Sequence, residues 1–248
     1  EDAVNPETKE PYLKRVKVQL HGEDSQDALH LPIFLQEAYQ HAESFCQRLG
    51  SRLPSGFIRT LLLRRVGSSM VAGRATAIRM LENWGTLDDD EDEDESSLLE
   101  QNEAKQLSSA EKEDLRAFIR ALEQNQEEDP KGTEVLKYLL DKDWLGFGCI
   151  IFSQYYDSVW WLAELVTKKL PHEKFGIYAG SDRSGIMENG NFQKVKRDAI
   201  KSMVSNREMR LILGTDAASE GLNLQRLGTL INLDLPWNPS RLEQRKGR

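Results

Sequence analysis

Four short apolar segments in the second half of the chain constrain its fold most strongly. They are "GCIIF" (148–152), "FGIYA" (175–179), "RLILG" (210–214) and "TLINL" (229–233). The helical patterns between them are "SVWWLAELVTKKL" (158–170), "FQKVKRDAIKSMV" (192–204) and the shorter "ASEGLNLQ" (218–225). Strands that alternate with helices are joined by right-handed crossovers and form a parallel sheet covered by helices. The sequence therefore predicts an α/β fold in this half.

In such sheets, ligands bind at the carboxyl ends of the strands. This rule selects the polar residues that follow each predicted strand. They are Ser153 and Gln154, Gly180, Thr215 and Asp216, and residues 234–238. We expect a functional edge of the sheet where these residues come together.

The first half of the chain has mainly helical patterns. "VKVQL" (16–20) alternates apolar and polar residues, which indicates one strand. A helix is predicted from residue 33 to Gly50, and another over residues 56–83, where Gly67 and Gly73 weaken the pattern. Ser108 and Glu111 form a capping-box signature for a third helix. Asp129 and Pro130 then signal the start of the next helix, where the α/β half begins.

Composition bounds the class of protein. The 248 residues allow one large domain or two small ones, and no apolar run approaches the length of about 20 residues that spans a bilayer. The polar, acidic start at Glu1 does not resemble a signal peptide, so we expect a cytoplasmic protein with no membrane partner. Cys46 and Cys149 are expected to be reduced, and the four histidines show no metal-ligand spacing.

The net charge of −8 does not exclude a nucleic-acid partner. Residues 88–95, "DDDEDEDE", contribute −8, so the remainder sums to −8 − (−8) = 0. Such a block repels itself, which predicts a solvated, disordered loop over about residues 86–100. An acidic mimic of nucleic acid is the alternative.

Two segments at the predicted functional edge carry candidate chemistry. "TDAASEGLNLQ" (215–225) offers small residues and turn N–H groups that suit a phosphate, or its first two residues only cap a helix. In the last segment, Asn238 and Pro239 predict a helix start. Three arginines then recur on one face of this helix: Arg241, Arg245 and Arg248. Arginine forks bind phosphate oxygens, so the row indicates a phosphate clamp, with a solvated basic helix as the alternative.

These segments resemble ordered motifs of one family. "CIIFSQY" is similar to motif IV, "LILGTDAASEGLNLQ" to motif V, and "LINLDLPWNPSRLEQRKGR" to the segment entering motif VI of superfamily-two helicases. Residues 129–248 therefore resemble the C-terminal RecA-like lobe of these proteins, and "SEGLNLQ" and "DLPWNPSRLEQR" favour the Swi/Snf-type double-stranded DNA translocases. The second of these segments is most similar to the bacterial branch near the RNA-polymerase-recycling ATPase RapA and related defence or restriction-associated translocases.

The resemblance implies a RecA-like parallel sheet flanked by helices, in a P-loop NTPase-type lobe. This lobe would span residues 129–248 and be truncated within motif VI, whose pattern is Gln-x-x-Gly-Arg-x-x-Arg. By position and type, residues 1–128 resemble the joining segment and helical protrusion that the family inserts before this lobe.

The resemblance also implies roles for individual residues. Contacts to the sugar-phosphate backbone of double-stranded DNA would come from Ser153, Gln154, Gly180 and Thr215. Contacts to the nucleotide would come from Glu220, Gly221 and Asn223. Arg248 would be an arginine finger, with Gln244 against the nucleotide pocket of a partner lobe and Arg245 as a helper.

Some family features are absent or altered. The 248 residues contain no Gly-x-x-x-x-Gly-Lys-Ser/Thr phosphate loop, and Asp-Glu pairs occur only within the acidic run over residues 88–95, not after a predicted strand as the metal motif requires. We therefore expect a fragment of a larger ATPase, inactive alone, whose N-terminal lobe holds ATP and Mg²⁺, with RNA polymerase or a defence complex as further candidate partners. Lys246 and Met203 depart from the usual residue types, and the loop over residues 181–193 looks long.

Two other functions stay open at this level. Motifs V and VI also occur in strand-separating RNA or DNA helicases, and a stand-alone flavodoxin-like binding domain would show the same strand pattern. Trp160 and Trp161 could stack on bases, although their amphipathic helix favours packing against the core.

Overall fold

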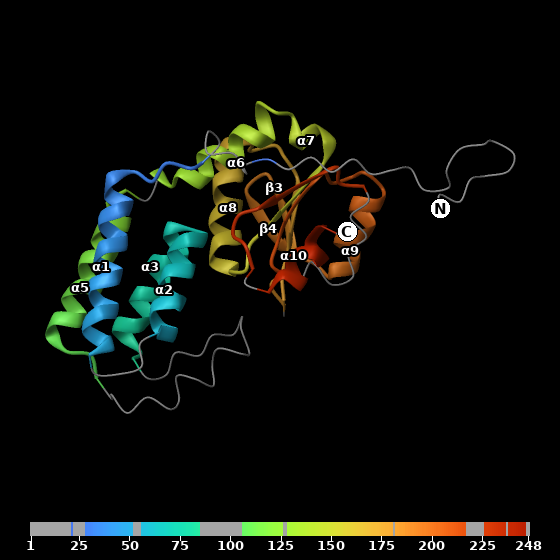
Figure 1. Cartoon of the computed structure of the whole chain (residues 1–248). Helices are drawn as coiled ribbons and strands as arrows, with labels where there is room; N and C mark the ends of the chain where they lie inside the picture. The colour runs from blue at the N-terminus through green and yellow to red at the C-terminus, as the bar shows by residue number, and fades with distance from the viewer. Residues whose placement is uncertain are drawn as a thin grey trace, which may run out of the picture. The chain divides into compact units, whose positions relative to one another are not determined.

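The computed structural model describes residues 21, 28–51, 56–84, 106–125, 128–180, 182–216, 226–236 and 238–246 (Figure 1). Residues from Leu31 onward belong to one compact unit, to which the following description applies. The predicted strand over residues 16–20 and the acidic run over residues 88–95 lie outside the described residues.

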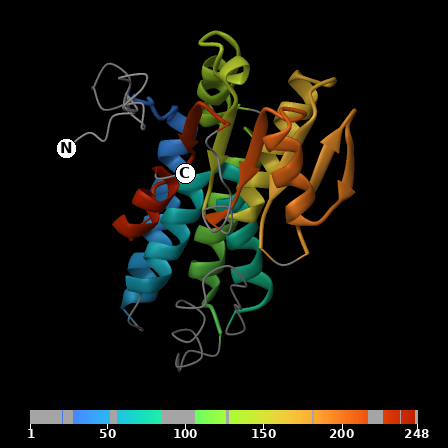
Figure 2. The same ribbon diagram turned by 90° about the vertical axis from the view of Figure 1, so that its right-hand side faces the viewer.

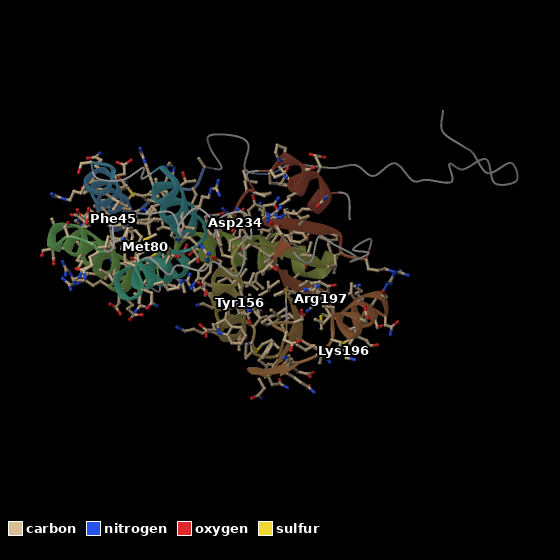
Figure 3. All side chains as sticks on the ribbon, turned by 90° about the horizontal axis from the view of Figure 1, so that it is seen from below. Phe45, Met80, Tyr156, Lys196, Arg197 and Asp234 are labelled. Atoms are coloured by element: carbon tan, nitrogen blue, oxygen red, sulfur yellow. The ribbon has the colours of Figure 1, made fainter. Side chains whose placement is uncertain are left out.

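Four helices of the first half pack around a hydrophobic core of their own. They are α1 (Ile33–Gly50), α2 (Gly56–Ser68), α3 (Met70–Glu82) and α5 (Ser109–Glu123), and together they are called the helical region below. Phe45 and Met80 are fully buried in this core (Figure 3). The predicted capping box is confirmed, because the Ser108 side chain accepts from the Glu111 N–H while Glu111 Oε2 accepts from the Ser108 N–H.

The helix predicted over residues 56–83 is broken at Ser69. This residue is extended, with φ −154° and ψ 157°, and its Oγ accepts a hydrogen bond from the Ala72 N–H at 3.1 Å. A serine that caps the next helix in this way ends the preceding one, because its backbone leaves the helical region of φ/ψ space. The prediction of one helix is wrong at this point, and the break lies at the serine rather than at either glycine.

Gly73 allows α2 and α3 to pack closely. A Cβ at this position would lie 2.7 Å from Val66 Cβ and 2.8 Å from its Cα, whereas a Cβ at Gly67 would meet its nearest neighbour, the Tyr39 hydroxyl, at 3.7 Å. We expect Gly73→Ala to lower the free energy of unfolding by about 1–3 kcal/mol through overpacking. Gly67→Ala is the matched control, and should raise this free energy by about 0.5–1 kcal/mol. Urea denaturation measures both, and equal effects would contradict the packing argument.

The described residues of the second half form a six-stranded sheet in the order β4-β3-β2-β5-β1-β6. Its strands are β1 (Cys149–Phe152), β2 (Phe175–Tyr178), β3 (Gly185–Glu188), β4 (Asn191–Lys194), β5 (Leu211–Gly214) and β6 (Thr229–Asn232). The strands β2, β5, β1 and β6 are parallel neighbours. All four predicted strands and the mostly parallel α/β fold are thus confirmed.

Helices cover both faces of this sheet. They are α6 (Pro130–Leu140), α7 (Trp144–Phe147), α8 (Tyr156–Lys169), α9 (Arg197–Ser205) and α10 (Pro239–Lys246). Alternate residues of β1 point to opposite faces, so Ile151 joins the core beneath α6 and α8, while Ile150 joins the core beneath α9. The three central strands β1, β2 and β5 are buried on both faces, which explains why they are continuously apolar.

The hairpin β3–β4 differs from the prediction. A helix was expected from residue 192, but residues 191–194 form β4, and α9 begins at Arg197. Asn189 and Gly190 connect the two strands with φ of 50° and 77°, the backbone that a tight two-residue hairpin turn requires. The long loop noted in the sequence is therefore an antiparallel extension at the edge of the sheet (Figure 2).

The start of α6 connects the two halves. The predicted cap is confirmed, because Asp129 Oδ1 accepts from the Lys131 N–H at 3.0 Å. The other carboxylate oxygen accepts from the N–H of Met70 at 2.9 Å, the first residue of α3. Burial raises the pKa of Asp129. One buried carboxylate thus caps a helix of each half.

Buried cysteines and tryptophans serve packing. Cys46 and Cys149 are free and buried, and burial raises their thiol pKa values to about 11 and about 12, so both are protonated at neutral pH. Trp160 and Trp161 are half-buried and pack against the core beneath α6 and α8, as predicted. Of the helices in the described ranges, none combines the length and apolar character needed to cross a membrane.

Candidate functional site

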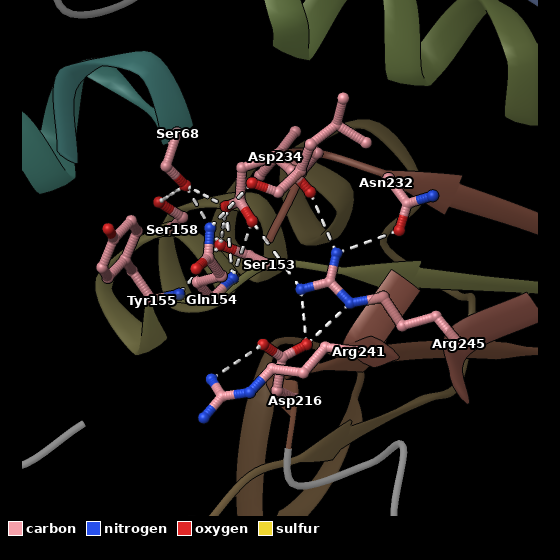
Figure 4. Close-up of polar contacts among 12 residues, drawn as sticks. Ser68, Ser153, Gln154, Tyr155, Ser158, Asp216, Asn232, Asp234, Arg241 and Arg245 are labelled. Carbon is pink, nitrogen blue, oxygen red and sulfur yellow. Dashed lines mark hydrogen bonds and ion pairs between the residues drawn. The ribbon is translucent and has the colours of Figure 1, made fainter. Parts of the chain in front are cut away.

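Four of the residues selected by the carboxyl-end rule lie together at one edge of the sheet: Ser153, Gln154, Asp216 and Asp234 (Figure 4). The strand β1 pairs in parallel with β5 on one side and with β6 on the other. The carboxyl ends of these three strands therefore lie side by side. Ser153 follows β1, Asp216 follows β5, and Asp234 follows β6. We call this edge, with the helix α10 packed on it, the carboxyl edge.

The carboxylate of Asp234 organises the end of β1. Its Oδ2 accepts from the Ser153 hydroxyl at 2.6 Å, and its Oδ1 accepts from the Gln154 N–H at 2.9 Å. Oδ2 also accepts from the hydroxyl of Ser68, at the end of α2, at 2.5 Å. Hydrogen bonds to an ionised acceptor are stronger than those between neutral groups, so this carboxylate fixes the loop after β1.

Arg245 anchors α10 to the same edge. Its side chain is 0% exposed, its Nε donates to Asp216 Oδ1 at 2.6 Å, and its Nη2 lies 2.5 Å from the same oxygen. Its Nη1 donates to Asn232 Oδ1 and to the carbonyl oxygen of Asp234, both at 2.9 Å. The guanidinium carbon also lies 5.2 Å from the centre of the Phe152 ring. One arginine on α10 therefore holds the ends of β5 and β6 together.

The helix itself starts as the sequence predicts. Asn238 Oδ1 accepts from the Ser240 N–H at 2.9 Å, and Pro239 is the first helical residue. The structure separates the predicted arginine row, because Arg245 is buried while the side chain of Arg241 is 43% exposed. Arg241 Nη1 lies 3.7 Å from Asp216 Oδ2.

The charge of Asp216 depends on these arginines. Burial raises the pKa of this carboxyl, and the charges of Arg245 and Arg241 oppose the increase. The distance of 2.5 Å between Asp216 Oδ1 and Arg245 Nη2 is that of an ion pair. Removal of one partner from a buried pair of this kind is costly, because the remaining charge stays desolvated and loses that counter-charge.

The residues predicted to contact nucleic acid have different surroundings. Ser153 is 1% exposed, with its hydroxyl on Asp234. Gln154 is half-buried and its side-chain amide donates to the Leu235 carbonyl at 3.1 Å. The Thr215 N–H donates to the Tyr178 carbonyl at 3.0 Å, and half-buried Gly180 follows β2 at the same edge. The structure thus gathers these residues at the carboxyl edge, and their contact with nucleic acid stays a prediction.

The residues predicted to face the nucleotide are only partly described. Gln244 is exposed on α10, one residue before buried Arg245. Four others lie outside the described residues: Glu220, Gly221, Asn223 and Arg248. Arg245 does not project into solvent, so its predicted helper role has to act through the position of α10.

Sequence reasoning missed the residues that tie the carboxyl edge together. Asp234 lay within a segment selected for inspection, yet neither it nor Asn232 was assigned a role, and Ser68 was not considered. For Asp234, its place after a buried strand was a usable signal. For Ser68, the "SS" pair inside a long helical pattern was the signal, because serine favours helix ends.

Comparison with known proteins shows what the sheet and its carboxyl edge are similar to. Residues 132–248 match the family model described as the helicase conserved C-terminal domain. This match favours the predicted helicase C-terminal lobe over a stand-alone flavodoxin-like domain. A protein of Bacillus subtilis (strain 168), described as the uncharacterized ATP-dependent helicase YqhH, is 43% identical over 65 residues. That match covers 26% of this chain and 12% of the relative.

A solved structure shares the fold. The helicase domain of Hef from Pyrococcus furiosus matches with a TM-score of 0.50 at 18% sequence identity, over 89% of this chain and 50% of that chain. At this identity the likeness concerns the fold alone. It extends over most of this chain and so beyond the part that the family model matches.

Proposed function

We propose that this chain supplies the C-terminal lobe of an ATP-dependent double-stranded DNA translocase of the Swi/Snf type. Its sheet and α10 would face an N-terminal ATPase lobe of the same protein across the nucleotide. Within this chain, a boundary near residues 128/129 would separate a helical protrusion from the C-terminal lobe. The observation that carries the proposal is the anchoring of α10 at the carboxyl edge, with Arg245 buried on Asp216 and Gln244 exposed beside it.

In this proposal, α10 of this chain would contact the nucleotide from one side, and the partner lobe would contact it from the other. The sequence has no phosphate loop, so the side chains that hold ATP phosphates and Mg²⁺ would belong to the partner lobe. On this chain, Gln244 is exposed on a helix whose backbone is fixed by Arg245. When bound, the nucleotide would supply the phosphoryl transfer, and α10 would supply positioned polar groups to it.

Support for a nucleic-acid partner comes from the position of the predicted contacts. Gln154, Gly180 and Thr215 follow three parallel strands, so a single phosphate backbone could run across them. Backbone N–H groups and amides contact phosphates without reading bases, as a translocase requires. Ser153, whose hydroxyl is held by Asp234, would contribute through the loop it stabilises rather than through its own hydroxyl.

The test uses the protein encoded by the complete open reading frame. ATP hydrolysis is measured with linear duplex DNA, single-stranded DNA or RNA, and translocation by displacement of the third strand of a DNA triplex. We expect duplex DNA to stimulate hydrolysis most, and the triplex to be resolved without unwinding of the duplex. Unwinding of a tailed duplex would instead support the strand-separating helicase. Absence of hydrolysis with every nucleic acid would overturn both functions.

A pair of amide variants locates the nucleic-acid contact. Gln154→Ala should weaken binding to all duplex sequences equally and leave its salt dependence unchanged, since a phosphate contact carries no sequence information and a neutral amide releases no counterion. Gln193→Ala, on the exposed strand β4, is the matched control and should leave affinity unchanged. Equal affinity for both variants would remove Gln154 from the predicted interface.

A further inference from the structure

The junction between α2 and α3 is buried against the carboxyl edge. The Ser68 hydroxyl lies 2.5 Å from Asp234 Oδ2, 3.0 Å from the Ser153 hydroxyl and 2.7 Å from the Ser158 hydroxyl. The Ser69 hydroxyl lies 2.7 Å from that of Ser158. All four serines are at most 1% exposed. A cluster of buried hydroxyls thus joins the helical region to the sheet.

Charged groups on either side close this junction. The ammonium group of Lys131 donates to the carbonyl oxygen of Gly67 and, at 2.5 Å, to that of Leu233. Burial lowers the pKa of Lys131, while the nearby Asp234 and Asp129 oppose the decrease. The guanidinium carbon of buried Arg65 lies 4.0 Å from the centre of the Tyr155 ring. Tyr155 is the residue that follows the segment held by Asp234.

Asp234 is the group that the helical region and α10 share. On one side its carboxylate accepts from Ser68, and on the other it lies 3.8 Å from Arg245 Nη2, while its carbonyl oxygen accepts from Arg245 Nη1 at 2.9 Å. Figure 4 shows this chain of contacts from Ser68 through Asp234 to Arg245. Ser68 and Arg245 are separated by most of the described chain, yet one residue links them.

We propose that Asp234 is a positioning residue through which the helical region holds α10 in place. Displacement of the α2–α3 junction would remove the Ser68 hydroxyl from the Asp234 carboxylate. Loss of a donor to a buried acceptor is costly, because the acceptor is left without that hydrogen bond. The carboxylate would then shift its bonding toward Ser153, Gln154 and Arg245, so the position of α10 depends on the helical region. The proposal rests on the proposed function, because α10 matters only if it faces a nucleotide.

The first test is a double-mutant cycle in this chain. Ser68→Ala and Arg245→Lys are combined, and unfolding equilibrium constants are measured in urea. If the two residues act independently, the double variant changes the unfolding equilibrium constant by the product of the two single changes. Because both residues contact Asp234, we expect the change in the double variant to differ from that product by about threefold or more. A product within that factor would overturn the coupling. Ser51→Ala, which removes an exposed hydroxyl directly after α1, is the control and should be independent of Arg245→Lys.

The second test separates positioning from simple stability. In the intact protein, at a temperature where both variants are fully folded, Ser68→Ala should lower kcat for ATP hydrolysis on the order of tenfold, since small misplacement of reacting groups is costly. KM for ATP should stay unchanged, and Ser51→Ala should match the wild type. An unchanged kcat with a lower melting temperature would overturn the positioning role. If the wild-type protein hydrolyses no ATP, the proposed function fails, while the cycle still decides the coupling.

Discussion

Replacement of Arg245 by alanine is expected to lower the free energy of unfolding by about 3–5 kcal/mol, as for other buried ion pairs that lose one partner. The side chain is 0% exposed, and its removal takes from the partly buried Asp216 carboxylate a counter-charge at 2.5 Å, whereas Arg241 lies farther away at 3.7 Å. Asn232 and the Asp234 carbonyl lose a donor at the same time. The ends of β5 and β6 would then no longer be held together by α10.

Urea denaturation of the chain measures this effect. Arg241→Ala is the matched control, because its side chain is 43% exposed and its contact with Asp216 is longer, so a loss below about 1 kcal/mol is expected. The double variant Asp216→Asn/Arg245→Met should recover part of the loss, since it leaves no unpaired buried charge. A loss below about 1 kcal/mol for Arg245→Ala would mean that Asp216 is satisfied without it.

Most of the fold could be predicted because its signals are local. Each central strand is a continuous apolar run, and this pattern alone separates a doubly covered parallel sheet from a half-exposed one. The hairpin β3–β4 was missed for a local reason too. Asn189-Gly190 is a strong turn signal, but residues 192–204 also fit a helical period, and the pattern gave no means of dividing them between β4 and α9.

The candidate site could be predicted in position but not in orientation. The carboxyl-end rule selected Ser153, Thr215 and Asp216 from the ends of the predicted strands alone, and β1 and β5 are parallel neighbours in the structure. It could not show that the Ser153 hydroxyl turns inward, because this depends on Asp234, 81 residues away. Arg245 looked like one of a row of surface arginines for the same reason, since its burial requires Asp216 to lie opposite it.

The second large effect concerns Arg248, which lies outside the described residues and whose role as an arginine finger comes from the resemblance to motif VI. In the intact protein, Arg248→Ala is expected to lower kcat for DNA-stimulated ATP hydrolysis by about 10³–10⁵-fold, because a finger stabilises charge that develops in the transition state. Arg248→Lys should recover little of this rate, since lysine keeps the charge but lacks the planar fork.

The control for Arg248 is an arginine at the opposite edge of the sheet. Arg210 precedes β5 and pairs with Glu173 at 2.7 Å on the surface, so Arg210→Ala should leave kcat unchanged. A kcat for Arg248→Ala within tenfold of the wild type would sink the finger assignment. Arg245 and Arg248 should give opposite results. The Arg248→Ala protein should have normal stability but no turnover, whereas the Arg245→Ala protein should unfold at a lower urea concentration than the wild type. Loss of turnover in both, with no loss of stability in either, would instead place both guanidinium groups at the nucleotide and contradict the buried position of Arg245.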